Sequence, residues 1–170
     1  MTTRRIFLTT LLAAVPFSQA LAGGKKTSVV DLSFHLQAEE GDNPKMVFSQ
    51  LTSGKVIKFR KTSEANSRDI ESFMPFPSRD GDGYGIQVKL KPGAALRVVA
   101  MTTNNSGRWL LSMVNGRTLD AVMIDKPVND GMLVIWKGIS EGELAELDKT
   151  YPRFGKSKPQ GAGGDKKKKI

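Results

Sequence analysis

The chain has 170 residues, no cysteine and a formal net charge of +9 at pH 7. Without cysteine it has no disulfides, no thiolate metal ligands and no cysteine nucleophile. The positive charge lies at the ends: residues 1–22 carry a net +2, residues 155–170 a net +5, and residues 23–154 only +2. A folded surface that binds nucleic acid concentrates basic residues, so we expect no specific nucleic-acid partner.

The N-terminus has the three parts of an export signal. Residues 1–5 are basic, Ile6 to Phe17 form an apolar run, and SQALA follows at residues 18–22. As a helix the apolar run would rise only about 18 Å, whereas the hydrocarbon core of a bilayer is about 30 Å thick. We therefore predict a signal peptide over residues 1–22, with Ala20 and Ala22 as the cleavage positions and Gly23 as the first mature residue.

Two adjacent arginines bear on which export route the signal peptide would use. Arg4 and Arg5, followed by Phe7 and Leu8, resemble the twin-arginine signal, although Thr9 stands where that signal usually has lysine. Ordinary secretory signals also contain paired arginines, so both export routes remain open. Either route predicts a bacterial protein that is periplasmic or secreted.

In the first half of the mature chain, a polar lead at residues 23–28 is followed by predicted strands. Apolar and polar residues alternate over residues 29–37, which is typical of a half-buried strand. Two shorter strands are expected over residues 46–48 and 55–60.

Residues 67–77 predict a short helix. Ser67 or Asp69 is placed to cap it, and the helix would continue through Ile70 and Phe73. Pro75 and Pro77 would end it.

The second half alternates strands and helices. Asn115-Gly116 is a strong hairpin signal, because both positions of such a turn need positive φ. Ser140 with Glu143 forms a capping box that opens a helix running to about Lys149. The remaining expected elements are a strand at 84–90, a helix at 94–102, strands at 109–114 and 117–124, and a buried strand at 132–136.

Together these elements predict one α+β domain over residues 29–154. Its sheet is expected to be mostly antiparallel, with two main helices and one short helix. Residues 155–170 contain one large apolar residue and the run Lys166, Lys167, Lys168 and Lys169, so we expect a disordered basic tail.

No residue pattern marks a catalytic or metal site. His35, the only histidine, lies on the polar face of its strand, where we expect it to be solvated; a hydrolase would need it as its base. The Asp80-Gly81-Asp82-Gly83 segment lacks the further acids of a calcium loop, and a plain flexible loop is expected. We interpret Trp109 and Trp136 as core or edge packing, with an exposed platform for sugar or peptide as the alternative. Accordingly we expect no catalytic residues, no cofactor and no metal, and a protein that is not an enzyme.

The order of short motifs from Ser67 to Leu147 resembles the head subdomain of the first periplasmic domain of the SecD/SecDF protein-export subunits. Two departures are Val122, where the family has proline, and a glycine displaced to Gly138. The motifs that carry the resemblance are Asp69-Ile70, Leu90, Thr102, Gly107-Arg108, Asn115-Gly116-Arg117, Ile124 with Pro127, Gly131, Ile139-Ser140 and Glu143-Leu144-Ala145.

The resemblance implies a head-like fold, a periplasmic setting and a surface for extended polypeptide. Active translocation does not carry over, because the export subunits bear this head on a membrane body. The expected function is a non-enzymatic binding or accessory domain that contacts extended polypeptide or an envelope protein, at a strand edge of the sheet containing residues 109–114 and 132–136. The alternative is attachment to anionic polymers or lipid headgroups through Lys166 to Lys169.

Overall fold

The computed structural model describes residues 30–154. The predicted signal peptide with its cleavage positions, the twin-arginine-like motif, the polar lead and the basic tail lie outside this range. The elements in chain order are β1 (Leu32–Leu36), the 3-10 turn η1 (Pro44–Met46), β2 (Val47–Thr52), β3 (Lys55–Arg60), β4 (Ala65–Asn66), the 3-10 turn η2 (Ser67–Asp69), β5 (Ile70–Pro77), β6 (Tyr84–Leu90), α1 (Pro92–Asn104), β7 (Trp109–Val114), β8 (Arg117–Met123), β9 (Met132–Ile139) and α2 (Glu141–Thr150).

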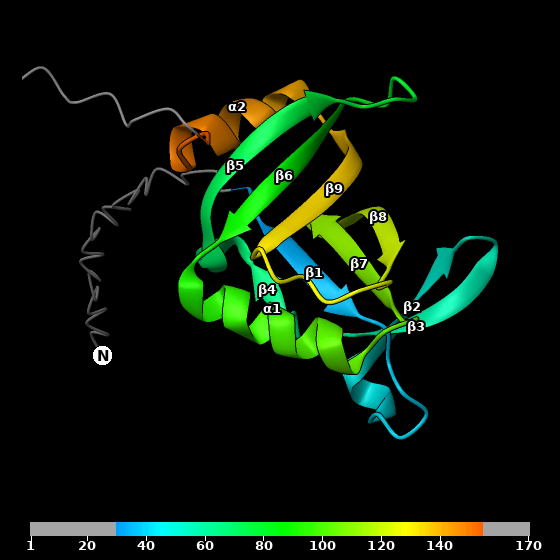
Figure 1. The fold of residues 1–170 in the computed structure, drawn as a ribbon. Helices are drawn as coiled ribbons and strands as arrows, with labels where there is room; N and C mark the ends of the chain where they lie inside the picture. The colour runs from blue at the N-terminus through cyan, green and yellow to red at the C-terminus, as the bar shows by residue number, and fades with distance from the viewer. Residues whose placement is uncertain (1–29, 155–170) are drawn as a thin grey trace, which may run out of the picture.

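The strands form two larger sheets and one separate hairpin (Figure 1). The first sheet has the order β4-β1-β7-β8, the second has the order β5-β6-β9, and β2 pairs only with β3. All of these strand pairs are antiparallel. The predicted α+β class with a mostly antiparallel sheet and two main helices is therefore confirmed.

The core lies between the sheets and the two helices. In the second sheet the buried apolar side chains alternate along β6 and β9, as the period of a half-buried strand requires. Helix α1 adds Ala94 and Val98 to the core, and α2 adds Leu147. Figure 1 shows α1 at one end of β5, β6 and β9, and α2 beside β5 at the other end.

The predicted turn and cap are both present. Asn115 and Gly116 have φ of 50° and 76° and connect β7 to β8. The Ser140 side chain accepts a hydrogen bond from the Glu143 amide, while the Glu143 carboxylate accepts one from the Ser140 amide. Contacts with distant residues add to both features, since Asn115 exchanges hydrogen bonds with Asp31, and Glu143 also accepts from Arg117.

The predicted helix through Ile70 and Phe73 is wrong. A single 3-10 turn ends at Asp69, and residues 70–77 form strand β5. Pro75 and Pro77 terminate helices, but they are also tolerated on an edge strand, where the missing amide would face away from the ladder. Strand β5 is at the edge of its sheet, and it buries Phe73 against the core.

Three smaller expectations change as well. Met46 belongs to η1 rather than to a strand, and β2 runs on to Thr52. Strand β9 continues to Ile139 and is half-exposed instead of buried, because only alternate residues face the core. Within residues 30–154, no helix has the length and apolar character needed to cross a bilayer.

Candidate functional site: an aromatic corner on the outer sheet face

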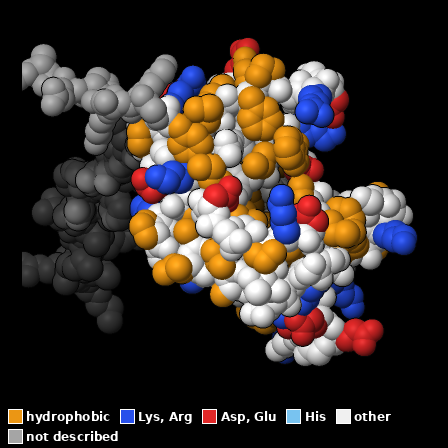
Figure 2. Space-filling view, viewed as in Figure 1, with side chains coloured by type: hydrophobic (Ala, Val, Ile, Leu, Met, Phe, Trp, Pro, Cys, Tyr) orange, Lys and Arg blue, Asp and Glu red, His pale blue; other side chains and the backbone are white. Residues whose placement is uncertain are grey.

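The face of the β5-β6-β9 sheet that points away from the core carries a group of apolar side chains. Met74 pairs with Gln87, and Gln87 pairs with Val134, so these three residues share that face. Met74 is 42% exposed and Trp136 is 52% exposed. Figure 2 shows hydrophobic side chains gathered over this part of the molecule. We call the side chains of Met74, Phe76, Val134 and Trp136 the outer apolar face.

At one end of this face two aromatic rings form a corner. The rings of Phe76 and Trp136 lie 6.0 Å apart, centroid to centroid, at 67°. This edge-to-face arrangement is a favoured geometry for aromatic pairs. The two rings, with Pro77, Arg79, Asp80 and Lys137, line a hollow of about 580 Å³. We call this the aromatic corner.

Gly85 makes the corner possible. It pairs with Phe76, and a Cβ atom at this position would lie 2.3 Å from the Phe76 ring and 2.6 Å from the main-chain oxygen of Trp136. The ring therefore packs directly against the backbone of β6, where no other residue type would leave room. Opposite Gly85 the register of β9 shifts, and this bulge redirects the chain after Trp136.

The loop between β5 and β6 forms a charged rim for the corner. Lys137 Nζ donates a hydrogen bond of 2.6 Å to Asp80 Oδ2, and the Ser78 hydroxyl donates to the other carboxylate oxygen. The Gly138 amide donates to the Asp82 carbonyl at 2.9 Å. These contacts tie the loop to β9, so the segment that we predicted to be plainly flexible is held in place.

The same contacts determine the charge of the rim. The hydrogen bond from Lys137, followed by that from Ser78, lowers the pKa of Asp80 to about 2. The bond to Asp80 raises the pKa of Lys137. Asp80 and Lys137 are therefore both charged at neutral pH, and Arg79 adds a further cation to the lining of the hollow.

The strand edges beside this face are occupied. On β5, the Phe73 amide donates to the Pro152 carbonyl, and the Phe154 amide donates to the Phe73 carbonyl. Farther along β5, Pro75 and Pro77 have no amide hydrogen to donate. On β9, the Trp136 amide donates to Asp120 Oδ2 at 3.2 Å. An incoming strand would therefore find few free groups on either edge.

Comparison with known proteins gives a similarity at the level of the fold. No protein-family model and no curated protein sequence matches the chain. Two solved structures of SecDF do match, one of them described as a membrane component that enhances protein export. The chain resembles SecDF.

The resemblance is limited in identity and in extent. The first SecDF structure has 16% identity and a TM-score of 0.48, and the match covers 69% of this chain and 60% of that one. The second has 18% identity and a TM-score of 0.47, over 69% of this chain and 18% of that one. The chain thus spans less than two thirds of either SecDF chain. The similarity concerns the fold alone.

The two tryptophans that we interpreted as core or edge packing differ in how far they are exposed. Trp109 is partly buried at the start of β7, which is an interior strand with β1 and β8 on its two sides. Residues 109–114 and 132–136, which we expected in one sheet, belong to two different sheets, and residues 109–114 offer no free edge of their own. Trp136 is half-exposed, so it is not core packing, and its use as a platform for sugar or peptide stays a prediction. The Met-Pro-Phe-Pro run at residues 74–77 is the sequence feature that could have indicated the other side of the aromatic corner.

His35 is buried, contrary to the expected solvated position, because the β2–β3 hairpin covers it. Its ring lies edge-on to Phe48 at 5.5 Å, and only 8% of the residue is exposed. Nδ1 donates to the Arg60 carbonyl at 2.9 Å, and Nε2 lies 3.0 Å from the Ser33 hydroxyl. This contact has the geometry that a serine nucleophile and its histidine base would have. However, the ring is held by a main-chain carbonyl instead of a carboxylate, and it connects β1 to β3.

Among residues 30–154 no three acidic or histidine side chains gather where they could hold a metal ion. Asp80, the first residue of the segment considered for calcium, is instead neutralised by Lys137.

Proposed function

We propose that this protein is an exported binding domain of the bacterial cell envelope that holds extended, apolar polypeptide on its outer apolar face. The observation that carries the proposal is the aromatic corner, where a half-exposed tryptophan and Phe76 border a hollow of about 580 Å³. A contact of this kind suits an accessory to protein export, since polypeptides in transit are extended and expose their apolar side chains.

The spacing of the face supports an extended chain as the ligand. In an extended polypeptide every second side chain lies on the same side, about 7 Å from the last. Met74 and Phe76 are two residues apart on β5, and Val134 and Trp136 are two residues apart on β9, so each row has that repeat. An apolar side chain of the ligand would enter the corner while its neighbour lies over Met74 or Val134.

The rim supplies polar partners for the ligand backbone. Arg79 and Lys137 bring donors to the border of the hollow, and carbonyl groups of an extended chain accept hydrogen bonds. We propose recognition through the face of the sheet in place of the strand-edge pairing expected from the sequence. The prolines of β5 and the Asp120 contact of β9 leave too few free backbone groups for edge pairing.

A binding experiment tests the proposal. A fluorescently labelled peptide of alternating leucine and serine is titrated with the protein, and its anisotropy is measured. We expect Trp136→Ala and Phe76→Ala each to weaken binding at least about tenfold, as the loss of a buried aromatic contact does. The matched control is Leu96→Ala, which removes an exposed side chain on α1. Equal affinity for all variants, or binding of a cell-wall oligosaccharide instead of the peptide at Trp136, would overturn the proposal.

The alternative function, attachment through Lys166 to Lys169, predicts a different result. Replacing those four lysines with serine would release the protein from the envelope fraction without changing peptide affinity. If the replacement abolished peptide binding, the aromatic corner would not be the site.

A further inference from the structure

The β2–β3 hairpin is a second exposed surface, separate from the outer apolar face. It forms its own two-stranded sheet and projects from the body of the molecule (Figure 1). The strands pair in register from Val47 with Arg60 to Thr52 with Lys55. Ser53 and Gly54, with φ of 49° and 75°, close the turn.

The two faces of this hairpin differ. One face buries Phe59 and Thr52 toward the body. The other face presents Leu51 and Val56, which lie directly opposite each other and are 67% and 73% exposed. Lys58 lies on the same face, paired with Ser49. The end of the hairpin thus carries an exposed aliphatic pair, of which Val56 also lines a hollow with Val47 and Pro44.

The charge of the hairpin has one sign. Between residues 47 and 61 there are four basic residues and no aspartate or glutamate. Lys58 is exposed on the face of the aliphatic pair, and Lys55 is exposed on the opposite face, where it pairs with Thr52 beside the turn. Figure 2 shows hydrophobic and basic side chains together on the projecting part.

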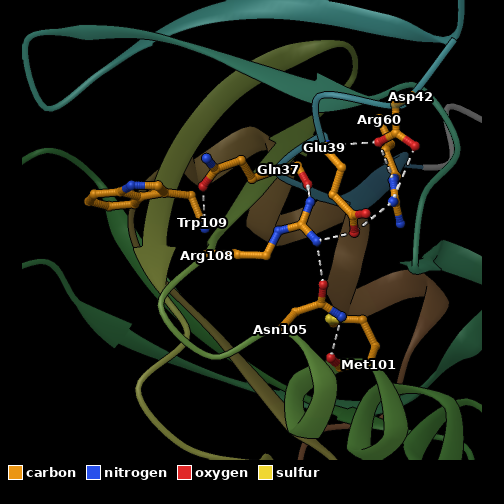
Figure 3. A network of polar contacts seen from close by, with 8 residues as sticks. All are labelled: Gln37, Glu39, Asp42, Arg60, Met101, Asn105, Arg108 and Trp109. Carbon is orange, nitrogen blue, oxygen red and sulfur yellow. Dashed lines mark hydrogen bonds and ion pairs between the residues drawn. The ribbon is translucent and has the colours of Figure 1, made fainter.

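The base of the hairpin is held firmly and neutralises the acidic loop beside it (Figure 3). Arg60 Nε donates to Asp42 Oδ2 at 2.8 Å, and Arg60 and Arg108 both contact Glu39. The Ala38 amide donates to the Lys58 carbonyl at 2.8 Å. The arginines therefore pair with Glu39 and Asp42, and Glu40 of the same loop lines a hollow with Lys58.

We propose that the hairpin tip docks on a bilayer that contains anionic phospholipid. Leu51 and Val56 enter the boundary between headgroups and acyl chains, and Lys55 and Lys58 contact the phosphates. Long lysine side chains cover apolar surface with their methylene groups while the ammonium remains in a polar layer. An uncharged turn, Ser53-Gly54, leads the insertion.

A bilayer matches this tip better than a protein does. A stable protein interface covers about 800 Å² on each partner, with aromatic residues at its centre. Here two aliphatic side chains occupy the end of a narrow ribbon. Such a tip buries little area against a flat protein, but it can sink into a lipid surface, where each lysine close to anionic headgroups strengthens binding about fivefold.

Vesicle sedimentation tests the inference with the protein as isolated from the cell envelope. On vesicles containing phosphatidylglycerol, we expect Leu51→Ser with Val56→Ser to reduce binding about tenfold or more. Lys55→Gln and Lys58→Gln should each reduce it about fivefold, and raised salt should weaken binding further. Vesicles of phosphatidylcholine alone should bind poorly.

The controls separate other sources of binding. Leu96→Ser, at an exposed leucine on α1, should leave vesicle binding unchanged, as should Trp136→Ala. The double serine variant is also measured with Lys166 to Lys169 replaced by serine, and it should still lower the remaining binding. Unchanged vesicle binding of the double variant would overturn the inference. The inference would also be overturned if the double variant lost a protein partner but still bound vesicles.

Discussion

The outer apolar face and the β2–β3 hairpin both expose apolar side chains, but they are built differently. The face lies on a three-stranded sheet, and it combines two aromatic rings with a rim of both charges. The hairpin carries two exposed aliphatic side chains and only basic charged residues of its own, and Glu39, Glu40 and Asp42 of the neighbouring loop line a hollow beside Val56 and Lys58. Exposure alone therefore does not identify a partner. Ring geometry and mixed charge favour a polypeptide in one case, and in the other the basic residues of the hairpin beside an aliphatic pair favour lipid.

The largest expected effect concerns the support of the hairpin. Phe59 is completely buried, and its ring lies 6.0 Å from that of Phe48. Phe59→Ala should lower the free energy of unfolding by about 3–5 kcal/mol, measured by urea denaturation. Val56→Ala, at the exposed tip of the same hairpin, should change it by less than about 0.5 kcal/mol. Similar losses for the two variants would mean that the hairpin is not anchored through Phe59.

The next effect tests the construction of the aromatic corner. Gly85→Val would place atoms within 2.6 Å of the Phe76 ring and the Trp136 backbone. We expect a loss of about 1–3 kcal/mol in the free energy of unfolding, together with weaker peptide binding and a shifted tryptophan emission. Gly93→Ala is the control, because a Cβ there would meet nothing within 4 Å. A Gly85→Val protein with native stability and full binding would show that Phe76 does not need this approach.

His35 provides an effect of similar size in a region that belongs to neither surface. His35→Ala removes the ring that packs against Phe48 and leaves the Arg60 carbonyl without its donor. The expected cost is about 1–3 kcal/mol, measured by thermal unfolding, with peptide binding unchanged. Ser33→Ala should cost about 1 kcal/mol or less. A covalent adduct at Ser33 with a serine-directed phosphonate would contradict this structural role.

The smallest effect concerns the rim. Because the folded pKa of Asp80 is about 2, below its ordinary value of 3.8, its ion pair contributes stability above pH 3.8. That contribution is lost as the pH falls toward 2. An NMR titration of the carboxyl carbon should give the low pKa, and Lys137→Gln should return it toward 3.8. A pKa near 3.8 in the unchanged protein would show that the rim contact is not formed.

Strong local signals predicted much of the fold. Strands 84–90 and 109–114 have the predicted bounds, since their side-chain pattern is decided by the strand itself. The Asn115-Gly116 turn and the Ser140 capping box were also predicted from neighbouring residues.

Features that depend on distant segments were predicted less well. Pro75 and Pro77 indicate a helix end until the place of β5 at a sheet edge is known. His35 follows the polar phase of its strand, yet a hairpin more than ten residues away buries it. Trp136 is exposed because no further layer covers that side of β9 within residues 30–154. The site itself requires Gly85 beneath Phe76, a contact that no spacing in the sequence indicates.

The most direct test of the polypeptide-binding proposal is photocrosslinking in intact cells. A photoreactive phenylalanine analogue is placed at Trp136, and a matched variant carries it at Leu96, which is exposed on α1. We predict that the analogue at Trp136 forms adducts with polypeptides in the cell envelope and that the analogue at Leu96 does not. No protein adduct at Trp136, or equal adducts at both positions, would contradict the proposal.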